Sequence, residues 1–342
     1  MGNIKISSTF SPKMTSMEVS IIIPVYNRAA VVPVTLQSVL AQTYRPLQLV
    51  LVDNHSTDAS LQVLQDFKQQ HESDDFKIVV TREEHRTAGA ARNHGFEYAT
   101  GEWVLFFDSD DIMKQDLVAS YVNIIERAQE NGKSIDLIST RSTLVFPDGR
   151  QREAPFHKRD LFANHILHGQ LATQRYAVRR EFFASTDGWN INLPGWNDWE
   201  LGLRLLLANP RVAYMGGQPL VIINHNGADS ITGTEFHSRQ GQWEHVIDIM
   251  KGEVRCSKLK QEHKRRYERL LEYRRMVLAA QYEREGHSEL SKPLCREAYA
   301  ALRETYHDSP RWRWFVAPVS RRLFARIASG KRGSARIARL LY

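Results

Sequence analysis

Three closely spaced aspartates after an apolar run are the residues of this sequence best placed to do chemistry. The run Trp-Val-Leu-Phe-Phe at 103–107 is followed by Asp-Ser-Asp-Asp at 108–111. Clustered carboxylates repel one another, and their hard oxygen atoms suit Mg²⁺ or Mn²⁺. The sequence therefore indicates a divalent-metal site. One alternative stays open, in which Asp111 only caps a helix over 114–129.

The element that must position these acids is a buried strand. Five apolar residues without polar alternation are typical of a strand covered on both faces. Upstream, apolar runs at 19–25, 47–52 and 77–80 alternate with helical patterns, which predicts a doubly wound α/β sheet. The second run also ends on an acid, Asp53. Because ligands bind at the carboxyl ends of such strands, the acidic ends predict one common site.

The alternation weakens after the acidic segment. We expect a helix to about residue 129 and a strand at 135–144, followed by strands at 170–178, 212–214 and 220–223 and a helix at 198–207. A loop at 187–197 is rich in Trp, Asn and Gly, which is typical of a binding wall. From about residue 235 the composition changes to long helices rich in Arg, Glu, Lys and Leu.

Length and composition limit the class of protein. A chain of 342 residues with 42% hydrophobic and 25% charged residues predicts a large domain with an appendage, or two domains. No apolar run reaches the roughly 18 residues of a membrane span, and residues 1–18 read as a polar leader without a signal peptide. Cys256 and Cys295 show no metal or redox spacing. We therefore expect a cytoplasmic protein.

The basic charge is confined to the last segment. Residues 311–342 hold nine Arg and Lys and no acid, so subtracting nine from the net charge of +7 leaves −2 for the rest. Aromatic residues at 312, 314 and 315 and apolar residues at 319, 323, 324 and 327 lie among these cations. This pattern is typical of an amphipathic helix on an anionic membrane surface. Docking on the protein stays open, and nucleic-acid binding is disfavoured because the body is not basic.

Five segments together carry a family resemblance. They are Val-Ser-Ile-Ile-Ile-Pro-Val-Tyr-Asn at 19–27, Val-Asp-Asn-His-Ser-Thr-Asp at 52–58, Gly-Ala-Ala-Arg-Asn-His-Gly at 89–95, Phe-Asp-Ser-Asp-Asp at 107–111 and Asn-Asp-Trp-Glu-Leu at 197–201. In this order they resemble a family 2 glycosyltransferase with the GT-A fold. The resemblance implies a mixed α/β sheet flanked by helices in a catalytic domain at 19–233. The change in composition, which the resemblance does not cover, indicates a helical extension at 234–310 and a basic amphipathic tail at 311–342.

The resemblance also implies roles on the donor side. Asp53 is expected to bind the nucleobase, with the loop of Pro24, Tyr26 and Asn27 packed around it. Asp108 is expected near the ribose or the metal, and Asp110 is expected to ligate Mn²⁺ or Mg²⁺ on the donor diphosphate. Arg92 is expected to help shape the donor pocket, with a structural ion pair as the alternative.

On the acceptor side, the resemblance makes Asp198 the catalytic base. Trp196 and Asn197 are expected beside it, although relatives often have Glu where this chain has Asn197. The alternative is that Asp198 only caps the helix it begins. His225 precedes a Ser-Ile-Thr stretch at 230–232, about two residues further away than in the family. It is expected to be a third metal ligand or a diphosphate contact, or else a plain loop histidine.

These roles imply an inverting, metal-dependent transferase of the hexosyltransferase type. The expected donor is a UDP-, GDP- or dTDP-sugar. The expected acceptor is a lipid-linked glycan of cell-surface polysaccharide assembly. The expected location is the inner face of the plasma membrane. A non-catalytic nucleotide-sugar-binding relative is the alternative, favoured only by Asn197. A nucleotidylyltransferase would need a Gly-rich phosphate loop after the first strand, where this chain has Tyr-Asn-Arg. A haloacid-dehalogenase-type phosphatase would need an Asp ending that strand.

Overall fold

The structure is a computed structural model that describes residues 17–193, 195–225, 235–307, 309–331 and 333–342. The predicted polar leader and the predicted boundary near residue 233 lie outside or at the edge of these ranges. We call residues 17–225 the sheet domain and residues 235–342 the helical extension.

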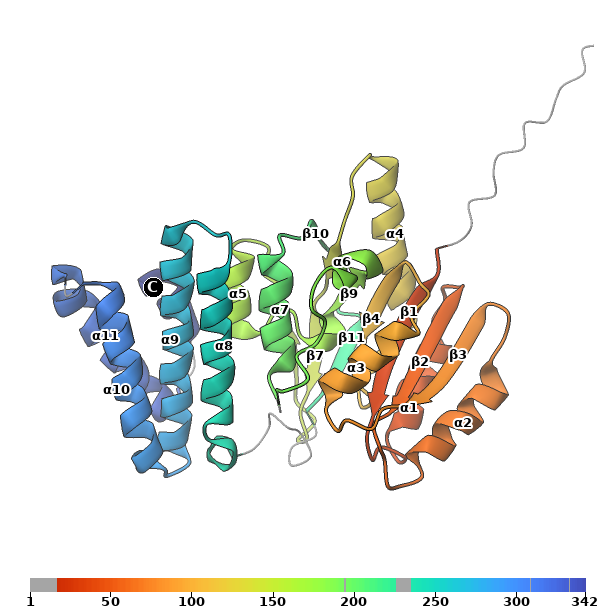
Figure 1. The fold of residues 1–342 in the computed structure, drawn as a ribbon, viewed down its shortest axis with the longest axis horizontal. Coiled ribbons are helices and arrows are strands. Elements are labelled where there is room, and N and C mark those ends of the chain that lie inside the picture. The colour runs from red at the N-terminus through yellow and green to blue at the C-terminus, as the bar shows by residue number, and fades with distance from the viewer. Residues whose placement is uncertain (1–16, 194, 226–234, 308, 332) are drawn as a thin grey trace, which may run out of the picture.

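The larger sheet has seven strands in the order β10-β6-β9-β4-β1-β2-β3 (Figure 1). Its strands are β1 Val19–Val25, β2 Leu47–Asp53, β3 Phe76–Arg82, β4 Trp103–Phe106, β6 Leu137–Ser139, β9 Tyr176–Arg179 and β10 Val212–Tyr214. Neighbouring strands run parallel except at β9, which is antiparallel to β4 and β6. The predicted mixed sheet is confirmed, with β4 and its acidic end at the centre.

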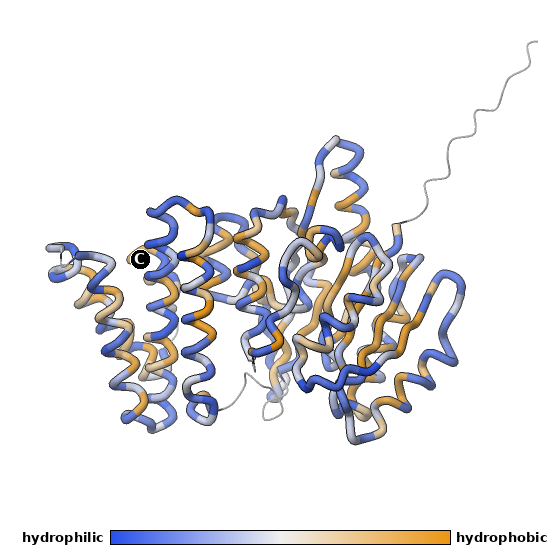
Figure 2. Tube along the Cα trace, viewed as in Figure 1, coloured by the Kyte–Doolittle hydropathy of each residue, from blue (hydrophilic) through white to orange (hydrophobic). Residues whose placement is uncertain are grey.

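Helices cover both faces of this sheet. One layer holds α1 (Val32–Leu40), α2 (Ser60–His71) and α4 (Leu117–Glu130), and the other holds α3 (Ala88–Glu97), α6 (Arg180–Ala184) and α7 (Asn197–Leu207). The strands are apolar almost throughout, whereas the outer helices are striped (Figure 2). A Cβ at Gly95 of α3 would lie 2.5 Å from a methyl carbon of Ile22, so glycine is needed for this helix to approach β1.

A smaller sheet begins directly after the acidic segment. It contains β5 (Ile112–Met113), β11 (Val221–Asn224), β7 (Ser142–Val145) and β8 (Gln151–Ala154), in that order. The single strand predicted at 135–144 is wrong, because the chain crosses from β6 in the large sheet to β7 in the small one. The strand predicted at 170–178 is only partly right, since a 3-10 turn at Thr173–Arg175 precedes β9. At the crossing, the backbone N–H of Thr140 donates to the carbonyl of Arg175.

The helical extension shares a core with the sheet domain. Its helices are α8 (Gln242–Cys256), α9 (Gln261–Arg284), α10 (Ser288–Thr305), α11 (Ala317–Ala328) and α12 (Ser334–Leu341). In Figure 1, α8 to α11 lie beyond α5 (Leu161–His168) and α7, away from β1 to β3. One apolar cluster joins Leu167 of α5 and Leu203 of α7 to Val246 of α8 and Leu270 of α9. The extension therefore covers an apolar side of the sheet domain.

The basic tail, residues 311–342, packs on the other helices of this extension. Leu323 and Ile327 of α11 and Leu341 of α12 are buried in the same apolar cluster. The sequence left open whether the tail docks on the protein. This apolar face of the tail does so. Trp314 and Phe315, in the π-helical turn that leads into α11, remain 84% and 57% exposed. Over the described ranges, no helix is both long and apolar enough to cross a bilayer.

A charged cluster lies where α7 meets α8. Arg204 of α7 pairs with Glu200 one turn before it and lies 3.5 Å from a carboxylate oxygen of Glu253 on α8. Glu200 is fully buried, and the Glu253 side chain is 18% exposed. Burial, followed by the contact with Glu200, raises the pKa of Glu253 well above its usual range. Two carboxylates share one guanidinium, so the pair retains a proton.

Glu253→Gln is expected to stabilise the protein at alkaline pH. Because the pKa of Glu253 is raised on folding, the folded state binds a proton that the unfolded chain releases above about pH 4.5, and stability falls as pH rises through this window. Glutamine keeps the shape without the titration. We expect a melting temperature about 2–4 °C higher at pH 8, and no gain near pH 4, measured by calorimetry. The exposed Glu262→Gln is the control, and a lower melting temperature at pH 8 would contradict the shared proton.

Candidate active site

The three acids at the end of β4 have different surroundings. The Asp108 side chain is 32% exposed, whereas Asp111 is 1% exposed. Oδ1 of Asp111 accepts from the backbone N–H of Asn224 at 2.8 Å. Asp111 therefore caps no helix: α4 begins only at Leu117, after Asp116. That alternative was wrong because residues 112–113 form β5, which pairs with β11.

Gln174 joins two of these acids. Its side-chain N–H₂ donates to Oδ2 of Asp108 at 2.5 Å and also to Oδ2 of Asp111. Burial, and then the charges of Asp108 and Asp110, raise the pKa of Asp111 well above its usual range. Gln174 could not be found from the sequence, since nothing local in the sequence pairs it with acids more than 60 residues away.

Arg92 supplies the positive charge of the site. Nη2 donates to Oδ1 of Asp108 at 2.5 Å, and the guanidinium lies 4.3 Å from the ring centre of Trp189. Arg92 is 95% buried, and its Nε and Nη1 have no hydrogen-bond partner among the described residues. Asn93 holds Trp189 by two hydrogen bonds of 2.8 Å with its backbone. The ion pair named as an alternative is present, and a role of Arg92 in donor binding stays a prediction.

The loops after β1 and β2 interlock at the same edge. Asp53 is fully buried, accepts from the backbone N–H of Ser56 and lies 3.5 Å from Nε of Arg82. Asn27 has a positive φ of 50°, and its Oδ1 accepts from the backbone N–H of Thr57 at 2.8 Å. Pro24 pairs with Val52 in the sheet, and Tyr26 is 47% exposed. These residues are brought together as predicted, while nucleobase binding stays a prediction.

Asp198 lies in the first turn of α7 but does not cap it. The N-cap position is Trp196, with a left-handed φ of 55°, and it makes no side-chain cap hydrogen bond. One oxygen of Asp198 accepts from the backbone N–H of Trp199 at 2.9 Å. Burial raises the pKa of Asp198; Arg92 lowers it and Asp108 raises it. Asp198 therefore belongs electrostatically to the same site as the acids of β4.

The two neighbours of Asp198 face different surroundings. The Trp196 ring packs on Trp199 and on Trp243 of α8, with ring centres 5.3 and 4.6 Å away. This contact joins the loop before α7 to the helical extension, and no local pattern in the sequence indicates it. Asn197 begins α7 and is partly buried.

His225 stands at the edge of the described residues. Its ring stacks on Phe146 at 5.0 Å, and its backbone N–H donates to the carbonyl of Val145. The preceding Asn224 donates from its side chain to the Asp110 carbonyl at 2.6 Å, so this strand end adjoins the acids. The stretch at 230–232 lies outside the described residues. A metal or diphosphate role for His225 stays a prediction.

The acidic edge fits a divalent cation in part. Within the described ranges, no three His, Cys, Asp or Glu side chains are arranged to hold one. Asp108 and Asp110 supply hard oxygen donors, and Mg²⁺ commonly takes its remaining ligands from substrate phosphates and water. Burial and then the charges of Asp108 and Asp110 raise the pKa of Asp111, and a cation would relieve the repulsion among these acids.

Comparison with known proteins agrees with this geometry. Residues 20–183 match the family model "Glycosyl transferase family 2". A "PGL/p-HBAD biosynthesis glycosyltransferase" of Mycobacterium tuberculosis is 29% identical over 225 residues, which are 63% of this chain and 79% of that protein. "Glycosyltransferase GlyA" of Streptococcus pneumoniae is 36% identical over 110 residues, 32% of this chain and only 15% of that protein.

Solved structures show the same fold over nearly the whole chain. TarS 1-349 of S. aureus in complex with UDP-GlcNAc has a TM-score of 0.67 at 17% identity, covering 95% of this chain and 91% of that one. The mannosyltransferase PcManGT of Pyrobaculum calidifontis, in complex with GDP-Man and Mn²⁺, has a TM-score of 0.55 at 17% identity, covering 96% and 88%. Residues 20–183, just under half of the chain, thus match glycosyl transferase family 2, and the chain shares the GT-A fold of these structures.

Proposed function

We propose that the chain is an inverting glycosyltransferase that moves a sugar from a nucleotide-diphosphate donor to an acceptor hydroxyl. The observation that carries this proposal is the position of Asp198 in the first turn of α7, near enough to Arg92 and Asp108 for their charges to shift its pKa in opposite directions. A carboxylate there can accept a proton beside the place where the acids of β4 would hold the donor.

In the proposed reaction, the acceptor oxygen attacks the anomeric carbon opposite the leaving group. The new C–O bond forms as the bond to the diphosphate oxygen breaks, and Asp198 takes the hydroxyl proton. Arg92 and Gln174 hold Asp108 in place, and the Asp53 loop orients the nucleoside. A Mn²⁺ or Mg²⁺ ion held by Asp110, with Asp108 and His225 as further candidates, would offset the charge of the departing diphosphate.

The relatives suggest which substrates to try. The structures of TarS and PcManGT hold UDP-GlcNAc and GDP-Man, and a matching protein of Bacillus subtilis is named "Minor teichoic acid biosynthesis protein GgaB". We therefore propose a nucleotide-sugar donor and a cell-surface glycan acceptor, lipid-linked, reached by peripheral contact with an anionic membrane. Work at the inner face of the plasma membrane would fit such an acceptor.

A donor panel tests the proposal. UDP-, GDP- and dTDP-sugars with Mn²⁺ are compared by thermal unfolding, where a donor at 100 times its dissociation constant adds about 2.7 kcal/mol of stability. We expect one nucleotide to stand out, and the anomeric configuration of the product, read by NMR, to be inverted. Binding without turnover on any glycan acceptor would favour the non-catalytic relative, and the absence of any shift would refute the donor class.

A further inference from the structure

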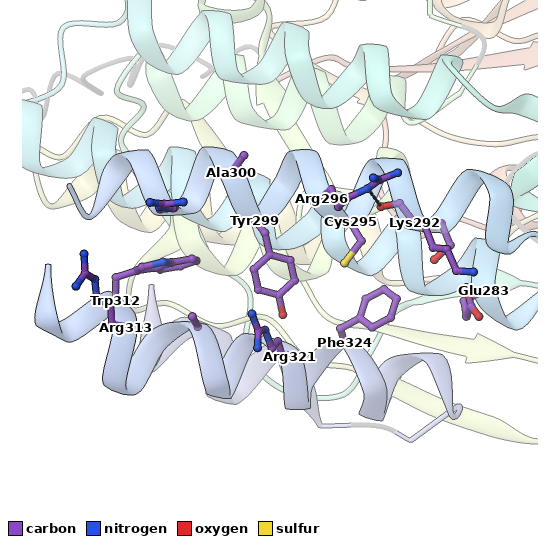
Figure 3. Close-up of a pocket in the computed structure, with 13 residues that line it drawn as sticks. Glu283, Lys292, Cys295, Arg296, Tyr299, Ala300, Trp312, Arg313, Arg321 and Phe324 are labelled. Atoms are coloured by element: carbon purple, nitrogen blue, oxygen red, sulfur yellow. Dashed lines mark hydrogen bonds between the residues drawn. The ribbon is translucent and has the colours of Figure 1, made fainter. Parts of the chain in front are cut away.

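A groove lies between α10 and the tail, outside the sheet domain. It is a cavity of about 930 Å³ with α10 on one side and residues 312–324 on the other (Figure 3). These helices belong to the helical extension and stand at the far end of the molecule from β1 to β3 of the sheet domain (Figure 1). The volume is that of a pocket for a sizeable organic ligand. The proposed transfer reaction makes no use of this groove.

The walls of the groove are largely apolar. In Figure 3, Tyr299 and Cys295 project from α10 toward α11, and Phe324 projects from α11 toward α10. The Trp312 ring closes one end, and Ala317 adds a small apolar surface. Side chains of this kind contact hydrocarbon well and offer little to a sugar or a nucleotide.

The rim of the groove is basic. Five cations and one acid line it, namely Lys292, Arg296, Arg303, Arg313 and Arg321 with Glu283. The hydroxyls of Ser291 and Tyr299 also line it and have no hydrogen-bond partner among the residues that the structure describes. Ser291 is fully buried. A buried hydroxyl without a partner is costly, so these groups favour a ligand that brings acceptor oxygens.

We infer that this groove binds one anionic lipid of a bilayer, with a hydrocarbon chain between α10 and α11 and its phosphate at the basic rim. Apolar walls, excess positive charge and unpartnered hydroxyls match the chain, the phosphate and the ester oxygens of such a lipid. The exposed rings of Trp314 and Phe315, next to the groove, suit the headgroup layer. The inference deepens the proposed membrane contact, on which it rests, and names the site of that contact.

The first test compares two neighbouring arginines. Arg321 lines the groove, whereas the exposed Arg322 does not. Full-length protein is sedimented with phosphatidylcholine vesicles, with and without phosphatidylglycerol. Arg321→Gln is expected to weaken binding to the anionic vesicles about fivefold, and Arg322→Gln is expected to weaken it less. Equal losses in the two variants would mean general attraction to a basic tail and would overturn the inference.

The second test reads occupancy at the groove itself. Cys295 lines the groove, and Cys256 is an exposed control in the same chain. Anionic vesicles are expected to slow maleimide labelling of Cys295 several-fold and to leave Cys256 unchanged, as followed by mass spectrometry. Ala317→Phe, which fills the groove, should abolish this difference, whereas Ala325→Phe on the exposed side of α11 should not. Unchanged labelling of Cys295 in the wild type would refute lipid occupancy.

Two further outcomes distinguish lipid binding from dimer formation and from the proposed transfer reaction. A protein dimer that protects Cys295 without lipid would make a second copy the occupant and overturn the inference. Asp198→Asn is expected to bind vesicles like the wild type, because neither test involves turnover. Absence of transfer by the wild type, with intact vesicle binding, would count against the proposed function alone.

Discussion

Asp198→Asn is expected to lower kcat by roughly a hundred- to ten-thousandfold, the range that one general base contributes. Asparagine has the same shape and can still accept from the backbone N–H of Trp199, but it cannot take the acceptor proton. Donor affinity should stay unchanged, since Asp198 is assigned to the acceptor side. Steady-state kinetics, combined with calorimetric titration of the donor nucleotide, separate the two effects.

The pH profile of the wild type gives a second readout for the same residue. Because burial raises the pKa of Asp198, the base is protonated, and so inactive, at a higher pH than an ordinary aspartate. The acid limb of kcat/KM should therefore lie above pH 4 and disappear in Asp198→Asn. Asp187→Asn, which removes an exposed acid earlier in the same loop, is the matched control. Near wild-type turnover in Asp198→Asn would show that another group is the base.

Asp110→Ala is expected to lower kcat/KM by about a hundred- to a thousandfold, the loss typical of one group that stabilises developing charge. The reason is the departing diphosphate, whose negative charge the acidic edge cannot balance without a cation. Calorimetry supplies a readout that needs no turnover. Mn²⁺ should strengthen binding of the donor nucleotide to the wild type and have little effect on its binding to Asp110→Ala.

Two controls accompany Asp110→Ala: a second substitution in the same chain and removal of the metal with EDTA. Asp116→Ala removes an exposed acid just before α4 and should leave both measurements unchanged. EDTA should reduce transfer by the wild type to the level of Asp110→Ala. Full activity in EDTA, or a metal effect that survives in Asp110→Ala, would rule out the assigned ligand.

The sequence predicted those parts of the fold that follow from local patterns. β1, β2 and β4 are continuous apolar runs, so burial on both faces could be read directly from them. The crossing from β6 to β7 could not, because Thr140 and Arg175 are 35 residues apart and meet only in the folded chain. The docking of the extension was also hidden, since an apolar helix stripe does not specify what covers it.

Some residues of the candidate site could likewise be found from the sequence, and others could not. Asp53, Asp108 and Asp198 could be found because strand ends, helix starts and the family resemblance mark them. Gln174 carries no such mark: its hydrogen bonds to Asp108 and Asp111 depend on how the 3-10 turn before β9 approaches β4. Asp111 does not cap a helix because the residues after it form β5, which pairs with β11. A strand of two residues leaves no recognisable pattern in a sequence.

The contact between α7 and the helical extension has consequences for truncation of this enzyme and for its synthesis on the ribosome. A fragment ending near residue 233 would expose Leu203 and Trp199 to water and leave Glu200 and Arg204 without the α8 side of their cluster. During translation, the sheet domain would leave the ribosome before the helices that cover this surface exist. Exchange of extensions between relatives would therefore have to preserve the α8 surface, or the helix that carries Asp198 would lose its support.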